Sequence, residues 1–139
     1  MNYEGTLTPW HPLLGLKGYC YIYSVHNDEK GFKVILVEED NNERKIIIAF
    51  PNGVRSYRAT DELLSINALE VAGEVNESIS PDSWSLFKIT DSEYLRWASE
   101  RSSSISEDLN LIHFAICTID WTLEILDNAE PIVEFIDVE

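Results

Sequence analysis

The residues best suited to nucleophilic catalysis are two cysteines and three histidines, and one pair of them lies close together in sequence. His113 and Cys117 are four positions apart in an apolar run that is typical of a strand. They would share a face, but four strand residues span about 13 Å, too far for a base to contact a nucleophile directly. We therefore expect His113 to be a core histidine and not half of a catalytic dyad.

The other patterns that could do chemistry are incomplete. The serines at 102–104 and 106 lack the Gly-x-Ser-x-Gly turn of a hydrolase and are expected to end a helix. The cysteines and scattered histidines match no zinc spacing, and the acidic run at 40–43 lacks the glycine and the length of a calcium loop. No glycine-rich phosphate loop occurs. With 25 acids, chance carboxylate pairs are inevitable. We expect no enzyme activity, no cofactor and no metal site.

The remaining candidate site is a set of acidic residues near the C-terminus. After Arg101 the sequence has nine acids and no Lys or Arg. If the strands expected there turn their apolar residues inward, the carboxylates line one rim, with a tryptophan as aromatic anchor. The candidate partner-binding residues are Asp120, Trp121, Glu124, Asp127, Glu130, Glu134 and Asp137. Core packing of Trp121 and a merely solvated acidic face remain the alternatives.

The distribution of charge also favours a protein partner. The net charge is −15, and it lies entirely in residues 59–139, because residues 1–58 sum to zero. Such an excess repels nucleic-acid phosphates and anionic lipid, so we expect neither as a direct ligand. It attracts cationic proteins and speeds their encounter. We therefore expect a basic protein partner; the oligomeric state stays open.

The compartment can be inferred from what the sequence contains. The first residues lack the basic and apolar regions of a signal peptide, and no apolar window reaches the roughly 20 residues of a membrane span. Cys20 and Cys117 lie in apolar runs, which suits buried free thiols in a reducing compartment. We expect a cytoplasmic protein.

The first half of the chain predicts an antiparallel sheet. Residues 19–25, 32–38 and 44–50 are β-branched and aromatic runs of strand length. Pro51–Asn52–Gly53 predicts a tight turn that pairs 46–50 with 54–58 as a hairpin. Thr60 could cap a short helix over 61–66. Residues 67–75 fit either helix or strand, and Pro81 marks a loop over 76–83.

The second half predicts one clear helix between strands. Residues 84–89 read as a strand, and 91–102 as a helix with Thr90 and Glu93 at capping-box spacing. Residues 111–118 are apolar on both faces, as a central strand should be. Residues 119–126 alternate like a strand, with a bend or short helix near Asp120, and 132–138 form a final strand. We expect one α+β domain over 1–139, an antiparallel sheet with one or two packed helices.

Three runs of the sequence resemble a group of small bacterial proteins: IIIAFPNGVRSYRATDELL, SLFKITDSEYLRWASERS and LIHFAICTIDWTLEILDNAEPIVEFI. The resemblance spans about residues 45–137 and concerns proteins of polymorphic-toxin loci that are taken to be immunity proteins. It implies a protein that binds a cognate toxin, a cationic domain such as a nuclease with a basic cleft, and blocks its active site. It carries over no functional residue.

Two other classes of binding protein remain open from the sequence. An acidic protein that imitates DNA would antagonise a DNA-binding protein, and its carboxylates would follow an elongated face with phosphate-like spacing. An adaptor or ligand-binding domain that is acidic only for solubility would have a deep apolar pocket and binding that is indifferent to salt.

Overall fold

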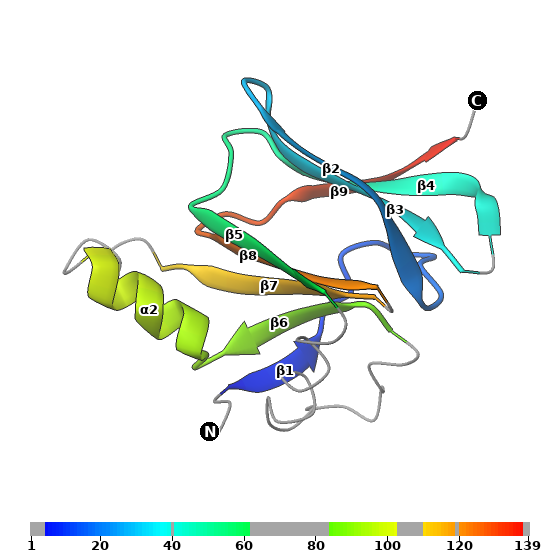
Figure 1. The fold of residues 1–139 in the computed structure, drawn as a ribbon. Helices are drawn as coiled ribbons and strands as arrows, with labels where there is room; N and C mark the ends of the chain where they lie inside the picture. The colour runs from blue at the N-terminus through cyan, green and yellow to red at the C-terminus, as the bar shows by residue number, and fades with distance from the viewer. Residues whose placement is uncertain (1–4, 40, 62–83, 103–109, 119, 138–139) are drawn as a thin grey trace.

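The structure is a computed structural model that describes residues 5–39, 41–61, 84–102, 110–118 and 120–137, and they form two antiparallel sheets and one helix (Figure 1). One sheet, sheet A, has five strands. Their spatial order is β1 (Thr6–Pro9), β6 (Leu86–Thr90), β7 (Ile112–Cys117), β8 (Trp121–Asp127) and β5 (Ser56–Asp61).

The other sheet, sheet B, has four strands and joins strands from the first half of the chain to its last described strand. Its order is β2 (Cys20–Asp28), β3 (Gly31–Glu38), β4 (Asn41–Phe50) and β9 (Ile132–Asp137). The first three strands form the expected meander. Gly31 (φ 111°) begins β3 at the β2–β3 turn, where a Cβ would lie only 2.5 Å from the Phe50 carbonyl oxygen, so no larger residue fits.

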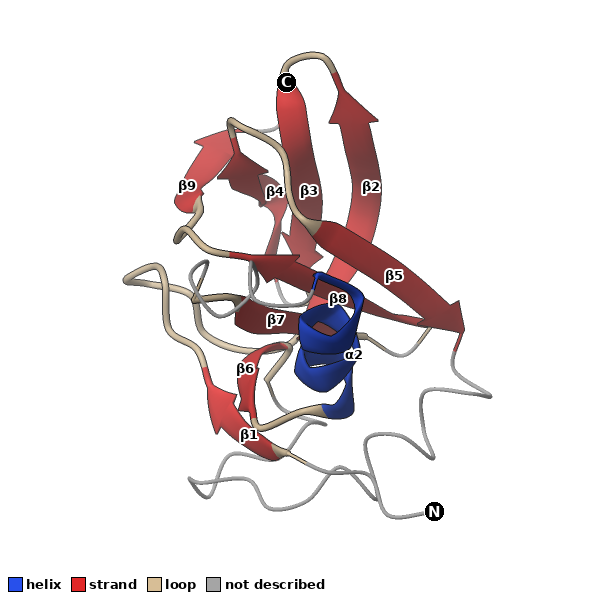
Figure 2. Cartoon of the chain, turned by 90° about the vertical axis from the view of Figure 1, so that its left-hand side faces the viewer, coloured by secondary structure: helices blue, strands red, loops and turns tan. Residues whose placement is uncertain are grey.

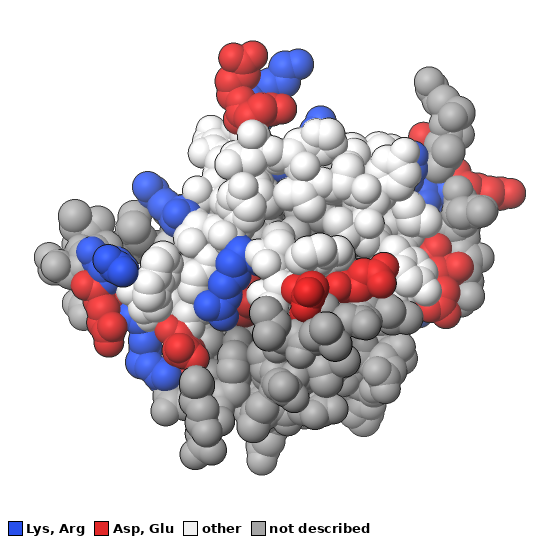
Figure 3. Space-filling model, viewed as in Figure 1, with Lys and Arg blue, Asp and Glu red and all other residues white. Residues whose placement is uncertain are grey.

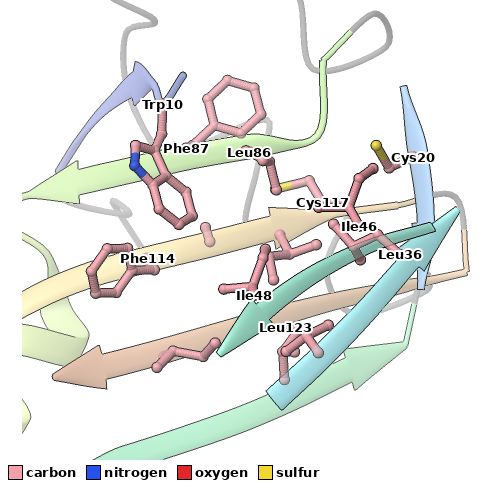
Figure 4. Packing of buried hydrophobic residues seen from close by; sticks show 14 of the residues in the cluster. Trp10, Cys20, Leu36, Ile46, Ile48, Leu86, Phe87, Phe114, Cys117 and Leu123 are labelled. Carbon is pink, nitrogen blue, oxygen red and sulfur yellow. The ribbon is translucent and has the colours of Figure 1, made fainter. Parts of the chain in front are cut away.

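The two sheets share one apolar core because β-branched and aromatic residues alternate along their strands. Figure 4 shows Leu36, Ile46 and Ile48 of sheet B among Leu86, Phe114 and Leu123 of sheet A. Aromatic contacts cross between the sheets, with 5.5 Å between the ring centres of Phe50 and Phe114. Cys20 and Cys117 are buried free thiols, as expected.

Helix α2 (Glu93–Ser102) lies against the face of sheet A that points away from sheet B (Figure 2). Tyr94 and Ala98 are its buried residues, and they pack with Leu126 of β8. In the part of the chain that the structure describes, no helix is long and apolar enough to cross a membrane.

The expected α+β class is wrong. The described chain has nine strands and one ten-residue helix, so the fold is mostly β. Thr60 does not cap a helix: it pairs with Thr122, and Asp61 pairs with Trp121, as the last residues of β5. A neighbouring strand and the β preference of threonine outweigh the local capping pattern. Residues 62–66 of that expected helix, and the undecided segments 67–75 and 76–83, lie outside the described residues.

The turn at Pro51–Asn52–Gly53 is present, but the hairpin expected from it is not. Gly53 (φ 78°) donates its N–H to the Phe50 carbonyl at 3.0 Å. Both edges of β4 are already occupied, by β3 and β9, so the chain leaves sheet B after Phe50. Residues 56–61 then pair with β8 in sheet A as β5. The competing β4–β9 pairing explains the difference.

A substitution of Phe114 tests how much the core shared by the two sheets contributes to stability. Its ring is fully buried and contacts both Trp10 and Phe50. We expect Phe114→Ala to lower the free energy of unfolding by about 3–5 kcal/mol, measured by urea denaturation, because it removes apolar contacts and leaves a cavity. Tyr23→Ala, at an aromatic residue that is 62% exposed on sheet B, should change it by less than about 1 kcal/mol. Equal losses would contradict this role of Phe114.

Candidate functional site

A chain of polar side chains crosses the buried interface between helix α2 and sheet A. Ser92 Oγ lies 2.7 Å from His113 Nδ1, and His113 Nε2 lies 2.9 Å from Glu124 Oε1. The Arg58 guanidinium donates to both oxygens of Glu124, at 2.7 Å from Nε and 3.2 Å from an Nη. Four segments therefore contribute one residue each to a continuous hydrogen-bonded chain.

The strand register explains why these residues meet. Glu124 of β8 pairs with Ala115 of β7 on one side and with Arg58 of β5 on the other. His113 lies two residues from Ala115, so its side chain shares the same face, opposite to the face of Phe114 that meets sheet B. Ser92 enters from the β6–α2 junction, where Asp91 has a positive φ of 53°.

Ser92 is also the residue that caps helix α2. Its hydroxyl oxygen accepts the N–H of Leu95 at 3.1 Å, three residues ahead, which is N-cap geometry. The sequence pattern placed the cap at Thr90 instead, but Thr90 is the last residue of β6. The cap lies two residues later than expected because β6 extends through Thr90.

Burial and hydrogen bonding act against each other on Glu124. Burial favours the protonated acid and raises its pKa, whereas hydrogen bonds from His113 and Arg58, and the positive charge of Arg58, favour the carboxylate. The second group of effects prevails and lowers the pKa of Glu124 to about 2. Glu124 is therefore charged at neutral pH and forms an ion pair with Arg58.

The Ser92–His113–Glu124 order resembles a hydrolytic triad, but its geometry is that of a structural network. Ser92 and His113 are fully buried, and the serine oxygen is engaged by the helix N-terminus. The Nε2 of His113 is bonded to Glu124, and its Nδ1 shares a hydrogen bond with the Ser92 hydroxyl, so each group has a partner. Burial also raises the pKa of the Cys117 thiol to about 12, which makes it a poor nucleophile.

An open cleft lies beside this network, between α2 and β5. It has a volume of about 240 Å³ and is lined by Ser56, Tyr57, Arg58, Glu93, Tyr94 and Trp97. Arg58 and Tyr94 connect it to the network, since the guanidinium carbon lies 4.1 Å from the centre of the Tyr94 ring. The Tyr94 hydroxyl is 2.5 Å from Ser56 Oγ. Trp97 of α2 is 45% exposed.

The seven residues expected to form an acidic rim occupy different environments. Glu124 is buried in the network, and Asp127 is also buried. Glu130 forms an ion pair with Lys88, and Glu134 is exposed on β9 in the other sheet. Asp120, Trp121 and Asp137 are exposed, and Trp121 is 47% accessible. The alternation of residues along β8 predicted that Glu124 would face solvent. Glu124 is buried because α2 packs on that face of the sheet, which the sequence did not reveal.

Asp120, Trp121 and Asp137 do lie at one end of the two sheets. The start of β8 and the ends of β9 and β3 all lie on the right-hand side of Figure 1. The exposed carboxylates of this acidic end are Glu39, Glu43, Asp61, Asp120 and Asp137. Red carboxylate atoms gather at that side of the molecule in Figure 3.

Tyr19 and Tyr21 lie beside Glu39 at the acidic end. The Tyr19 carbonyl accepts the Glu39 N–H at 2.9 Å, and the Tyr21 hydroxyl lies 3.2 Å from a Glu39 carboxylate oxygen. Burial raises the pKa of Tyr19, and Tyr21, Cys117, Asp120 and Glu39 raise it further. Asp120 of sheet A and Glu39 of sheet B therefore act on the same tyrosine.

Comparison of the chain with protein-family models, with curated proteins and with solved structures finds no match. Among the described residues, no group of three or more His, Cys, Asp or Glu side chains is arranged to hold a metal ion.

Replacing the cap residue should destabilise the helix and the network together. We expect Ser92→Ala to lower the free energy of unfolding by about 1–2 kcal/mol, because the Leu95 N–H and His113 each lose a partner. Thr90→Ala is the matched control, and its effect in the same denaturation experiment should stay below about 0.5 kcal/mol. A larger loss of unfolding free energy in Thr90→Ala than in Ser92→Ala would show that Thr90 is the N-cap residue.

The lowered pKa of Glu124 predicts a specific loss of stability in acid. The folded-state pKa of about 2 lies below the ordinary 4.5, so the contribution is present above pH 4.5 and is lost as the pH falls towards 2. Its size is on the order of 3 kcal/mol. We expect the difference in unfolding free energy between the wild type and Glu124→Gln to shrink as the pH falls from 4.5 towards 2. A difference that is constant from pH 7 to pH 2.5 would exclude the charged pair as its source.

Proposed function

We propose that this chain is a cytoplasmic immunity-type protein that binds a cationic toxin domain through the acidic end and thereby neutralises it. The observation that carries the proposal is that exposed carboxylates of both sheets lie at the same end of the molecule as the exposed Trp121. Tryptophan is one of the residue types that contribute most to the binding energy of protein interfaces. The resemblance to immunity proteins agrees with such a role.

Carboxylates outnumber cations at the acidic end. Among nearby cations, Arg44 forms an ion pair with Glu38 at 2.8 Å, and the Lys45 ammonium lies 4.0 Å from the centre of the Tyr23 ring. Lys17 is exposed two residues after Gly15, whose carbonyl accepts a hydrogen bond from Arg44. A basic surface that approached would therefore meet a negative potential, which raises the association rate and makes it sensitive to salt.

The polar network supports a role in binding over a role in catalysis. Its serine and histidine are buried and engaged in holding α2 against sheet A, so they present no nucleophile to a substrate. We therefore propose that the protein acts by occupying the surface of its partner. The acidic end requires no chemical step for that purpose.

The proposal can be tested with the protein encoded by the gene immediately upstream as the candidate partner. We expect nanomolar binding in surface plasmon resonance, with an association rate that falls at least tenfold between 50 and 300 mM NaCl. The double variant Asp120→Asn/Asp137→Asn should lower the association rate several-fold, and Trp121→Ala should raise the dissociation rate at least tenfold.

The matched control removes the same amount of charge elsewhere. Glu29→Gln/Glu100→Gln changes two exposed acids, one in the β2–β3 turn and one on α2. It should leave both rates within about twofold, because the docking surface is unchanged. If the two double variants slow association equally, net charge alone attracts the partner and the acidic end is not the docking surface. Binding that is indifferent to salt would also contradict the proposal.

A further inference from the structure

Sheet B carries apolar side chains on both of its faces. Leu36, Ile46 and Ile48 point into the core, and the residues that alternate with them along β3 and β4 point the other way. An antiparallel strand with one face in water alternates apolar and polar residues, whereas apolar residues on both faces are typical of strands that are covered on both sides. The apolar residues of the outer face are Tyr23, Ile35, Val37, Ile47, Ala49, Ile132 and Ile136.

None of the described helices or strands covers this outer face. Sheet A lies on the opposite face of sheet B, and α2 lies against sheet A (Figure 1). Tyr23 and Ile132 are 62% and 56% exposed, and neither Ile35 nor Ile47 belongs to the apolar core. A contiguous apolar surface of this kind marks a contact with another molecule.

The size and shape of the outer face suit a second copy of the same sheet. Four strands about 4.8 Å apart, each with about six residues of 3.3 Å, make a surface of roughly 20 by 20 Å. Two such surfaces in contact hide on the order of 1,000 Å² of accessible surface, which is enough for a specific but weak interface. Sheets pack face to face with their strands within about 30° of each other, and two copies have the same twist. We therefore expect a dimer of micromolar affinity.

The charge of the outer face allows two copies to approach each other there. Lys33 and Lys45 lie on it with three acids, Asp28, Glu43 and Glu134, so the face sums to −1. The whole chain sums to −15, so two copies repel each other wherever their acidic surfaces meet. Contact through the outer face of sheet B keeps those acidic surfaces apart.

The strand order determines how two copies can be oriented. Strands β2 and β9 are the two edges of sheet B, and Glu134 lies on β9 beside Ile47 in the middle of the face. A twofold axis that crosses the strands would place Glu134 against Glu134 of the other copy, and like charges repel. An axis parallel to the strands places β9 over β2 of the other copy instead. Glu134 then comes within reach of Lys33 of the other copy, so the face is complementary to itself.

We propose that this protein forms a symmetric dimer in which the outer faces of sheet B pack together about an axis parallel to the strands. The contact is apolar at its centre, and Lys33 and Glu134 form ion pairs between the copies. This arrangement leaves both acidic ends exposed and places them on the same side of the dimer. The proposal does not depend on the function of the acidic end.

Analytical ultracentrifugation over about 1–300 µM protein tests the proposal. We expect the average mass to rise from that of a monomer to twice that value. Raising NaCl from about 50 to 300 mM should strengthen the dimer several-fold, because salt screens the repulsion between two chains of charge −15. Binding of a cationic partner at the acidic end should weaken over the same range, so salt separates the two contacts. A protein that stays monomeric at the highest concentration would overturn the proposal.

A charge at the centre of the outer face should prevent dimerisation. We expect Ile47→Lys to weaken the dimer at least tenfold, because it places an ammonium group in an apolar interface. The matched control is Leu14→Lys in the β1–β2 loop, where Leu14 is 96% exposed, and it should change the dissociation constant by less than twofold. If Ile47→Lys does not fold, Ile47→Thr keeps the strand preference and should weaken the dimer several-fold. Unchanged dimerisation of the folded variant would contradict the proposed interface.

Charge reversal tests the orientation, at about 300 mM NaCl to screen long-range repulsion. Glu134→Lys and Lys33→Glu should each weaken the dimer several-fold, and the double variant should restore its affinity to within twofold. Additive losses would exclude the axis parallel to the strands. The variant Asp120→Asn/Asp137→Asn should dimerise within twofold of the wild type, so failure of the dimer is distinct from failure at the acidic end.

Discussion

The buried carboxylate of Glu124 is the constraint around which this end of the molecule is organised. An unpaired charge at that position would cost several kcal/mol, so every neighbouring element must supply a donor. Strand β5 supplies Arg58 and β7 supplies His113. The other ring nitrogen of His113 is hydrogen-bonded to Ser92 at the start of α2. The single described helix is thus held by the hydrogen bond between Ser92 and His113 and by the contact of Arg58 with Tyr94, besides its apolar contact with Leu126.

Much of the local structure could be predicted from sequence, whereas the sheet partners could not. The meander of β2, β3 and β4, the central strand β7 and helix α2 follow from residue patterns with a period of two or of about 3.6. The class was wrong because Thr60 and Asp61 have a good capping pattern but also have partners on β8. The sequence of a single strand does not show which distant strand it pairs with, as β4 pairs with β9.

The same reasoning explains which parts of the candidate site were missed. Alternation along β8 placed Glu124 away from the sheet interface correctly, but the covering helix made that second face an interior as well. Arg58 and Glu124 are 66 positions apart, and no local pattern connects them. Asp120, Trp121 and Asp137 remained on the surface because they lie at strand ends, beyond the reach of α2.

The late position of β9 in the chain has a consequence for synthesis on the ribosome. Strand β4 ends at Phe50 and its second neighbour begins at Ile132, about eighty residues later. At roughly 5–20 residues per second, translation leaves one edge of β4, with Ile46, Ile47 and Ile48, without that neighbour for roughly 4–16 seconds. An uncovered strand edge of this kind templates unwanted pairing, so the nascent chain is most prone to aggregate before its last strand emerges.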